Sequence, residues 1–194
     1  MKLVIGLGNP GKEYDKTRHN VGYAVVDTLV SEISRIRICD VKFRHDRKLN
    51  SEIAKVDDLV FAKPTTFMNN SGLAVSKLAS YFRVARNDIY VVHDDLDINI
   101  GDFKIQNTKG PHNHNGVLSV EEHLGGRDFW RVRVGIENRK RVHDDTKSNL
   151  AFIPGEDYVL SRFGKDEIGI VDKATKQIVE DLLGIYLAEG KQNG

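Results

Sequence analysis

The first apolar run of the chain, residues 3–7, leads directly into a glycine-rich turn. A short continuous apolar run is typical of a strand that is buried in the middle of a sheet. Gly6, Gly8 and Gly11 then follow the spacing of the dinucleotide-binding fingerprint. The chain must leave a buried strand through a sharp turn, and this requirement constrains the fold more than any other local feature.

The glycine spacing taken alone predicts a nicotinamide or flavin enzyme, but the residues after Gly11 do not fit that class. A dinucleotide-binding fold begins its first helix at these glycines, and the helix N-terminus holds the pyrophosphate. Here residues 12–20 have no apolar face, and apolar periodicity starts near Val21, with Asn20 in the N-cap position. Asp27, near the distance expected of a ribose-binding acid, falls inside the predicted helix. We therefore interpret the glycines as shaping a turn into a long polar loop.

Short apolar runs alternate with amphipathic segments along the rest of the chain. We expect strands at residues 3–7, 41–43, 51–56, 59–63, 89–92, 100–105 and 129–136. We expect helices at residues 21–33, 69–82, 115–124 and 166–187, the last interrupted near Gly184. This alternation predicts an α/β fold with a mixed, mostly parallel central sheet flanked by helices. A length of 194 residues fits a single domain spanning residues 1–194.

Composition excludes several classes of protein. The chain is 40% hydrophobic and 29% charged, as in soluble globular proteins, and a net charge of +1 means that any basic surface must be local. The single cysteine, Cys39, excludes a disulfide framework and indicates a reducing compartment. The sequence shows neither a signal-peptide pattern nor an apolar run of membrane-spanning length. We therefore expect a cytoplasmic protein without a membrane segment.

Two polar stretches that follow predicted strands carry the residue types of acid–base catalysis. His19 lies in the loop after the first strand, and the stretch HDDLD begins at His93, after the strand at 89–92. Ligands of open α/β sheets bind beyond the carboxyl ends of parallel strands, where these stretches would meet. A carboxylate bonded to an imidazole fixes the imidazole tautomer, so His19 and Asp94 together would deprotonate a water. The alternative is that the aspartates are turn residues and His93 is a buried strand end.

Two further stretches precede predicted helices, KPTTFMNNSG at 63–72 and KGPHNHNG at 109–116. The first holds more amide and aromatic side chains than a helix cap requires. In the second, His112 and His114 would provide a metal site together with His19 and Asp94, whereas Asn115 would simply cap the helix. No His-x-x-x-His or cysteine pair fixes a ligand geometry. We therefore expect no metal and keep a metal-dependent hydrolase as an alternative.

Basic side chains recur in the second half of the chain, at Lys104, Lys109, Arg127, Arg131, Arg133 and 139–141. Interleaved acids make a solvated face the default interpretation. Lys104 and Arg133, however, lie on predicted strands near the candidate site. Phosphate contacts from such residues would position a nucleic acid without reading its sequence.

Taken together, these stretches resemble the bacterial-type peptidyl-tRNA hydrolase family. The matching segments occur in the family's order and span most of the chain: GLGNPGKEYDKTRHNVG at 6–22, KPTTFMNNSG at 63–72, VVHDDLDINIGDFKI at 91–105, HNG at 114–116, FWRVRVGI at 129–136 and YVLSRF at 158–163. The resemblance implies an enzyme that cleaves the ester between a peptide and the 3′ ribose of tRNA. It implies that this reaction recycles tRNA from stalled translation and needs neither a metal nor a cofactor.

The resemblance also implies roles for individual residues. His19 matches the family's catalytic histidine, Asp94 the aspartate that holds it, and Asn9 the asparagine thought to distinguish N-blocked peptidyl-tRNA from free aminoacyl-tRNA. It further implies substrate contacts at Tyr14, Phe67, Asn69 and Asn115, and tRNA phosphate contacts at Lys104 and Arg133. The implied partner is peptidyl-tRNA, through its acceptor stem, 3′ end and nascent peptide, and we expect a monomer to bind it.

Two segments depart from the family pattern. The family usually carries a glycine-rich run before HNG, where this chain has Pro111, His112 and Asn113. The segment 137–154 is longer and more polar than the family pattern. A binding module, similar to the hydrolase-like plastid proteins that act in intron splicing, is a further alternative. The retained His19 and Asp94 favour the enzyme.

Overall fold

The computed structural model describes residues 1–111, 113–139 and 153–190 of the chain. Its seven strands form one sheet in the order β2-β3-β4-β1-β5-β7-β6. The strands are β1 Lys2–Gly6, β2 Arg44–Asp46, β3 Ser51–Val56, β4 Leu59–Pro64, β5 Ile89–Asn99, β6 Phe103–Asn107 and β7 Trp130–Glu137. The four central strands, β4, β1, β5 and β7, pair in parallel. The three remaining pairings, at the two edges, are antiparallel. The predicted mixed α/β sheet is confirmed, with its parallel part at the centre, but with three parallel and three antiparallel pairings it is not mostly parallel.

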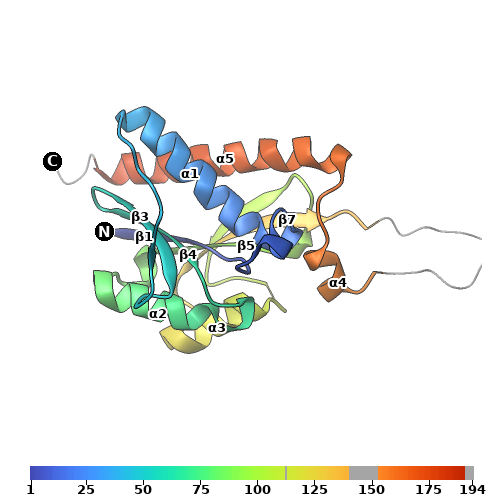
Figure 1. Ribbon diagram of the computed structural model, residues 1–194, viewed down its shortest axis with the longest axis horizontal. Helices are drawn as coiled ribbons and strands as arrows, with labels where there is room; N and C mark the ends of the chain where they lie inside the picture. Colours follow the sequence, from blue (N-terminus) through green and yellow to red (C-terminus); the bar gives the residue numbers. More distant parts are fainter. Residues whose placement is uncertain (112, 140–152, 191–194) are drawn as a thin grey trace, which may run out of the picture.

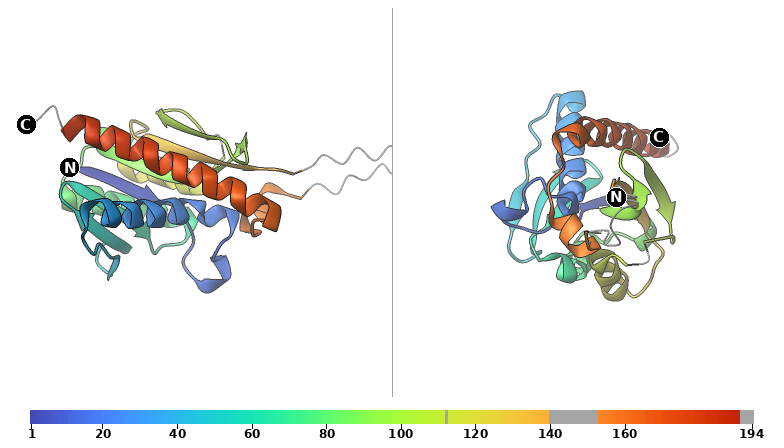
Figure 2. Two further views of the ribbon diagram at one scale, coloured as in Figure 1. Left: turned by 90° about the horizontal axis from the view of Figure 1, so that it is seen from above. Right: turned by 90° about the vertical axis from the view of Figure 1, so that its right-hand side faces the viewer.

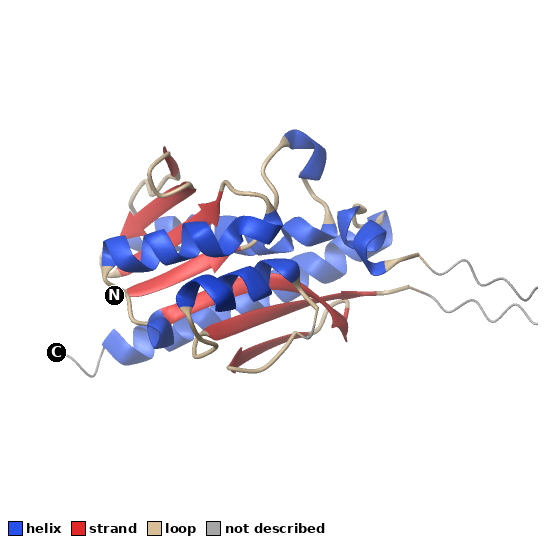
Figure 3. Cartoon of the chain, turned by 90° about the horizontal axis from the view of Figure 1, so that it is seen from below, coloured by secondary structure: helices blue, strands red, loops and turns tan. Residues whose placement is uncertain are grey.

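Helices cover both faces of this sheet. They are α1 Val21–Arg37, α2 Ser71–Phe82, α3 Asn115–Leu124, α4 Gly155–Leu160 and α5 Lys165–Gly190. Four short 3₁₀ turns complete the described elements: η1 Lys12–Tyr14, η2 Arg18–Asn20, η3 Met68–Asn70 and η4 Arg86–Asp88. Helices α1 and α5 lie side by side over one face, and α2 and α3 lie over the other (Figures 1 and 2). Figure 3 shows the second face, with its helices in front of the strands.

The alternation of side chains along the strands divides the core into two layers. Val4, Tyr90 and Val92 pack in the cluster that includes α1 and α5, whereas Leu3 and Val91 pack in the cluster that includes α2 and α3. Neighbouring strand residues therefore face different helices, as the two-residue strand period requires. This alternation decides which partners the polar residues at the ends of the strands can reach.

The glycines at the start of the chain serve backbone packing. A Cβ atom on Gly6 would overlap the carbonyl of Gly22, and a Cβ atom on Gly22 would lie 2.5 Å from the carbonyl oxygens of Leu7 and Val92. Gly11 has φ 115°, a conformation that side chains disfavour. Helix α1 begins well after this turn, at Val21. The glycines thus let the chain turn, as the sequence predicted, and Gly6 and Gly22 also let β1 contact α1, which was not predicted.

The structure differs from the predictions where charge or glycine interrupts a pattern. Strand β5 continues to Asn99, because Asp94 and Asp95 extend the parallel ladder to Val134 and Gly135 of β7. Helix α5 is continuous through Gly184, since buried residues on either side of that glycine keep the same face packed on the core. Helix α4 was not predicted, because six residues are too few to show a helical period.

Smaller differences concern the ends of elements. Strand β2 lies at Arg44–Asp46 rather than at 41–43, and β6 lies at Phe103–Asn107 rather than at 100–105. Most of the polar segment 137–154 lies outside the described residues. Within the described part of the chain, no helix is both long enough and apolar enough to cross a lipid bilayer.

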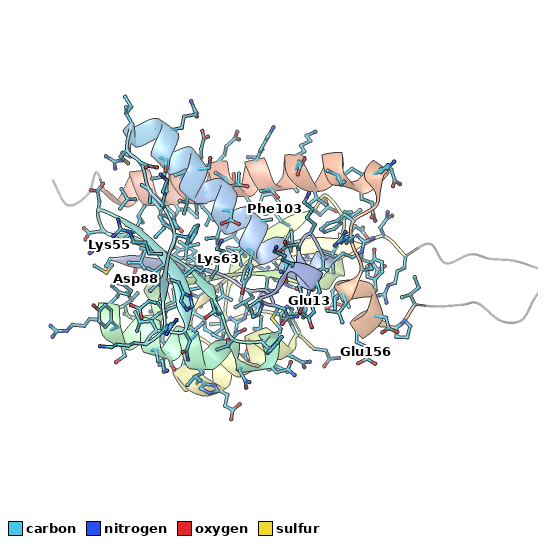
Figure 4. The ribbon with its side chains drawn as sticks, in the orientation of Figure 1. Glu13, Lys55, Lys63, Asp88, Phe103 and Glu156 are labelled. Atoms are coloured by element: carbon cyan, nitrogen blue, oxygen red, sulfur yellow. The ribbon has the colours of Figure 1, made fainter. Side chains whose placement is uncertain are left out.

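The polar loops gather at one end of the molecule. Figure 4 places Glu13 of η1 and Glu156 of α4 at this end, whereas Lys55 and Asp88 lie toward the opposite end. The central strands run toward the end that carries Glu13, so their carboxyl termini open onto these loops (Figure 1). This is where an open α/β sheet places its ligands.

Candidate active site

The structure brings together His19 and Asp94, which lie 75 residues apart in the sequence. His19 belongs to the 3₁₀ turn η2, directly before α1, and Asp94 belongs to the central strand β5. The Nδ1 atom of His19 is 2.7 Å from Oδ1 of Asp94. The Asp94 side chain is 2% exposed, whereas that of His19 is 14% exposed. The carboxylate is therefore buried, while the imidazole reaches the surface of a cleft.

A second imidazole binds the same carboxylate oxygen. The Nε2 atom of His114 lies 2.9 Å from Oδ1 of Asp94. The other ring nitrogen, Nδ1, accepts a hydrogen bond from the backbone N–H of Val117, so His114 caps α3. Because Nδ1 accepts, the ring proton of a neutral His114 sits on Nε2 and is donated to Asp94. The alternative that Asn115 caps this helix is wrong, since Asn115 is its first residue.

These contacts determine the charge state of Asp94. Burial raises the pKa of its carboxyl, but the imidazoles of His114 and His19 and their hydrogen bonds outweigh burial. The pKa of Asp94 is therefore held well below its usual range. An ionised Asp94 accepts the Nδ1 proton of His19, which leaves Nε2 of His19 as the basic nitrogen.

A third imidazole, that of His93, lies beside the His114 ring and is fully buried. Its Nδ1 is 2.7 Å from the backbone oxygen of Asp94, and its ring meets the His114 ring edge to face at 4.9 Å. Burial, together with the neighbouring His114, lowers the pKa of His93 to about 3. His93 is therefore neutral near pH 7. The alternative in which His93 is a buried strand residue describes it correctly.

Asn9 is held in one orientation by three hydrogen bonds. Its side-chain oxygen accepts from the backbone N–H of Met68 at 2.8 Å. Its backbone N–H donates to Oδ1 of Asn20, and its carbonyl accepts from Nδ2 of Asn20. Because the side-chain oxygen faces Met68, the NH₂ group of Asn9 is the part left for the cleft. Asn20 occupies the N-cap position of α1, as predicted, but its side chain makes no cap hydrogen bond and instead closes the Asn9 loop.

Asn9, His19 and Asp94 line one cleft with a volume of about 940 Å³. Its walls contain His19, Asp94, Asn9, Phe67, Asn69, His114 and Asn115. Tyr14 lies beside it, with its ring in edge contact with that of Phe67 at 6.3 Å between centroids. A second cavity, of about 820 Å³, shares Asn9 but contains neither His19 nor Asp94. The chemistry of the first cavity identifies it as the candidate site.

Lys104 and Arg133 lie outside the walls of this cleft. They are register partners on β6 and β7 and therefore share one face of the sheet. Lys104 is exposed. The side chain of Arg133 is only 11% exposed, with Nε 2.7 Å from Oδ2 of Asp95 and Nη1 3.0 Å from Oε1 of Gln106.

Side chains that could hold a metal ion are present at the site. One ligand atom each from His19, Asp94 and His114 lies within 4.8 Å of the others. Both imidazole nitrogens that face Asp94, however, are within hydrogen-bond distance of the same carboxylate oxygen. A cation bound there would displace both hydrogen bonds. His112, the fourth residue of the metal alternative, lies outside the described residues.

Sequence reasoning paired His19 with Asp94 but considered His114 only as a metal ligand. The signal for its actual position was available, because it directly precedes the predicted helix. Neither the Asn9–Asn20 contact nor the hydrogen bond from Met68 has a local sequence signature.

An ionised carboxylate that orients an imidazole, at the carboxyl ends of parallel strands, defines an α/β protein equipped for general-base catalysis. The profile of the peptidyl-tRNA hydrolase family matches residues 3–193 of this chain. The chain belongs to the peptidyl-tRNA hydrolase family.

Curated relatives and solved structures carry the same family name. The peptidyl-tRNA hydrolase of Francisella tularensis subsp. tularensis (strain FSC 198) is 42% identical over 165 residues, which cover 83% of this chain and 78% of that protein. The peptidyl-tRNA hydrolase of Pediococcus pentosaceus is 39% identical over 170 residues, with coverages of 87% and 83%. The crystal structure of peptidyl-tRNA hydrolase from Acinetobacter baumannii superimposes with a TM-score of 0.80 at 26% identity, covering 99% of this chain and 91% of that one.

Proposed function

We propose that this protein hydrolyses the ester bond between the peptide and the 3′ ribose of peptidyl-tRNA, and that His19 activates the water. The observation that carries the proposal is the 2.7 Å contact between His19 and the buried Asp94, at the edge of an open cleft in a chain of this family. An ester is already an activated acyl group. A positioned base and a water are therefore sufficient for its hydrolysis.

The proposed reaction moves one proton through His19. Nε2 of His19 takes a proton from water as the oxygen attacks the ester carbonyl. Asp94 stabilises the imidazolium that forms, because its carboxylate already accepts the Nδ1 proton. The same proton then passes from Nε2 to the departing 3′ oxygen, which releases the peptide acid and the tRNA. General-base assistance of this kind contributes about 10²- to 10⁴-fold to the rate.

Amide and aromatic side chains of the cleft would place the substrate. The NH₂ group of Asn9, fixed by Met68, is a donor for the peptide end or for the developing oxyanion. Asn69 and Asn115 add further donors in the same cleft. Phe67 and Tyr14 offer aromatic surface on which an apolar side chain or a base can pack.

The sheet edge that carries Lys104 would contact the tRNA phosphates. Lys104 is exposed there, and Arg133 shares its face. Asp95 and Gln106 engage Nε and Nη1 of Arg133, so Nη2, which no described residue engages, is the group that would meet a phosphate. We further propose that the chain acts as one domain and a monomer in the cytoplasm, where its free Cys39 stays reduced.

The experiment that tests this proposal compares N-acetyl-aminoacyl-tRNA with unblocked aminoacyl-tRNA, in EDTA, for the wild type and His19→Ala. We expect cleavage of the blocked substrate alone, and a rate about 10²- to 10⁴-fold lower in His19→Ala. His45→Ala is the matched control, because His45 is exposed on the edge strand β2.

Each other outcome points to a specific alternative. Loss of activity on chelation would support the metal-dependent hydrolase. Binding of tRNA without cleavage would support the RNA-binding module. An unimpaired His19→Ala variant would refute the assigned base.

A further inference from the structure

The 3₁₀ turn η2 anchors three consecutive side chains to three different parts of the fold. Asn20 binds the Asn9 loop after β1, and His19 binds Asp94 in β5. Arg18 binds Glu167 in the first turn of the C-terminal helix α5. The first two contacts belong to the site already described. The third involves residues 149 positions apart and has no part in the reaction as derived above.

Arg18 is buried as completely as a core residue. Its Nη2 lies 2.7 Å from Oε2 of Glu167, and both side chains are 7% exposed. The guanidinium carbon lies 4.3 Å from the ring centroid of Tyr158 and 4.8 Å from that of Phe163. A planar cation between two aromatic faces is held in orientation as well as in place.

Glu167 is itself fixed by further donors. Its Oε1 accepts from Nδ2 of Asn138 at 2.9 Å, and its Oε2 accepts from the backbone N–H of Gly164 at 2.6 Å. Burial alone would raise the pKa of Glu167, but the hydrogen bonds from Arg18 and Asn138 lower it below its usual value. The carboxylate is therefore ionised and joined both to the end of β7 and to the start of α5.

The main chain reinforces the same contact. The backbone N–H of Arg18 donates to the carbonyl of Ser161 at 2.9 Å, and Thr17 forms an isolated bridge with Arg162. The segment between α4 and α5 thus holds the turn through backbone and side chain together. Because His19 is the next residue in a turn of only three, a rotation of Arg18 about the chain also rotates His19.

We propose that Arg18 and Glu167 are positioning residues that hold η2 so that His19 faces Asp94 and the cleft. The inference rests on the proposed role of His19 as the base. In this proposal the first turn of α5, which is distant in the sequence, helps to orient the His19 imidazole. A displacement of about 1 Å at a reacting group can lower a rate by about 10²-fold.

The first test is kinetic and uses Glu167→Gln, which keeps the side-chain shape and removes its charge. We expect kcat for N-acetyl-aminoacyl-tRNA to fall about tenfold, with KM within about twofold, well below the melting temperature of the variant. The matched control is Glu121→Gln. It breaks an ion pair of similar length, 2.6 Å, to the fully buried Arg131, and the Arg131 side chain faces α3 rather than η2. The control is expected to lose stability and keep its kcat.

The second test reads His19 directly and needs no substrate. In the wild type, the ¹⁵N chemical shifts of the neutral His19 ring should show a protonated Nδ1 and an unprotonated Nε2. In Glu167→Gln the two shifts should move toward each other as the hydrogen bond to Asp94 loosens, whereas in Glu121→Gln they should stay. This readout separates aiming of the imidazole from a general loss of stability.

Each outcome decides the question. A folded Glu167→Gln with wild-type kcat and unchanged His19 shifts overturns the proposal, as does an equal loss of kcat in Glu121→Gln. If Glu167→Gln does not fold, Glu167→Asp keeps the charge but withdraws the carboxylate, and the same two measurements apply. If the wild type does not cleave the substrate, the proposed function fails, and the His19 shifts alone decide whether Arg18 and Glu167 aim the ring.

Discussion

Asp94 and Asp95 are neighbours in β5 and are equally buried, at 2% exposure, yet they meet opposite environments. Asp94 lies on the strand face that carries Val92 and accepts from His19 and His114. Asp95 lies on the other face, where its carboxylate binds Arg133 and the backbone N–H of Asp97. One residue type at one level of burial thus serves two purposes.

The side chain that each carboxylate binds decides what the carboxylate can do. An imidazole takes up and releases protons near neutral pH, so a carboxylate beside it can tune a base. A guanidinium stays protonated at all relevant pH values, so a carboxylate beside it can only hold it in place. The Asp94 face therefore carries the proposed chemistry, and the Asp95 face carries a fixed ion pair beneath the proposed phosphate contacts.

Within the comparison of these two aspartates, the largest expected effect on the rate follows from Asp94→Asn. The amide cannot accept from both imidazoles with a full negative charge, so His19 loses its tautomer preference and the support for its imidazolium. We expect kcat to fall about 10²-fold or more in single-turnover cleavage of N-acetyl-aminoacyl-tRNA. A wild-type rate in this variant would show that the two residues are not coupled.

Asp95→Asn is expected to change stability rather than rate. It leaves the largely buried guanidinium of Arg133 without its carboxylate, which should lower the free energy of unfolding by about 3 kcal/mol. Urea denaturation measures this loss, and kcat at a temperature where the variant is folded should stay near the wild-type value. If Asp95→Asn were as slow as Asp94→Asn, the contrast between the two faces would be wrong.

Acid should destabilise the protein through the buried imidazole of His93 in β5. The pKa of His93 is about 3 in the folded state and about 6.5 in the unfolded chain. Between these values the unfolded state binds one more proton, so stability falls as pH falls, by about 1.4 kcal/mol per pH unit. From pH 6.5, where the unfolded histidine is half protonated, to pH 4.5 this amounts to about 2 kcal/mol.

His93→Gln should remove this slope, because glutamine does not titrate. Urea denaturation at pH 6.5 and pH 4.5 gives the comparison, with His45→Gln as the exposed control that keeps the wild-type slope. Parallel curves for His93→Gln and the wild type would show that His93 is not held neutral.

The smallest expected effect is that of Lys104→Ala, on the sheet edge that also carries Arg133. Loss of one phosphate contact should reduce the slope of log K against log[salt] by about 0.7 to 0.9 for tRNA binding, with kcat unchanged. Lys55→Ala is the control, since Lys55 is exposed toward the opposite end of the molecule (Figure 4). Equal slopes for Lys104→Ala and the wild type would place the phosphates elsewhere.

The sequence was sufficient for features that depend on local pattern. Continuous apolar runs predicted the central parallel strands, and the polar residues after those runs predicted that His19 and Asp94 would meet. The full length of β5 was missed, because its aspartates remain in a buried strand only through partners from distant segments, such as His114 and Arg133. The contact between Arg18 and Glu167 has no sequence signal at all, since 149 positions separate the two residues.

The backbone contact between Gly6 and Gly22 fixes how closely α1 can approach the sheet at the candidate site. Helix α1 follows directly after the turn that carries His19, and it rests on β1 with main chain against main chain. Packed side chains can adjust to a shift of the helix by changing rotamer. Two backbones in direct contact have no rotamers to change, so the distance between them is fixed. The distance of the His19 imidazole from the sheet is thus set by the contact between the two backbones. A methyl group added at Gly6 or Gly22 would move α1 and His19 away from the sheet together.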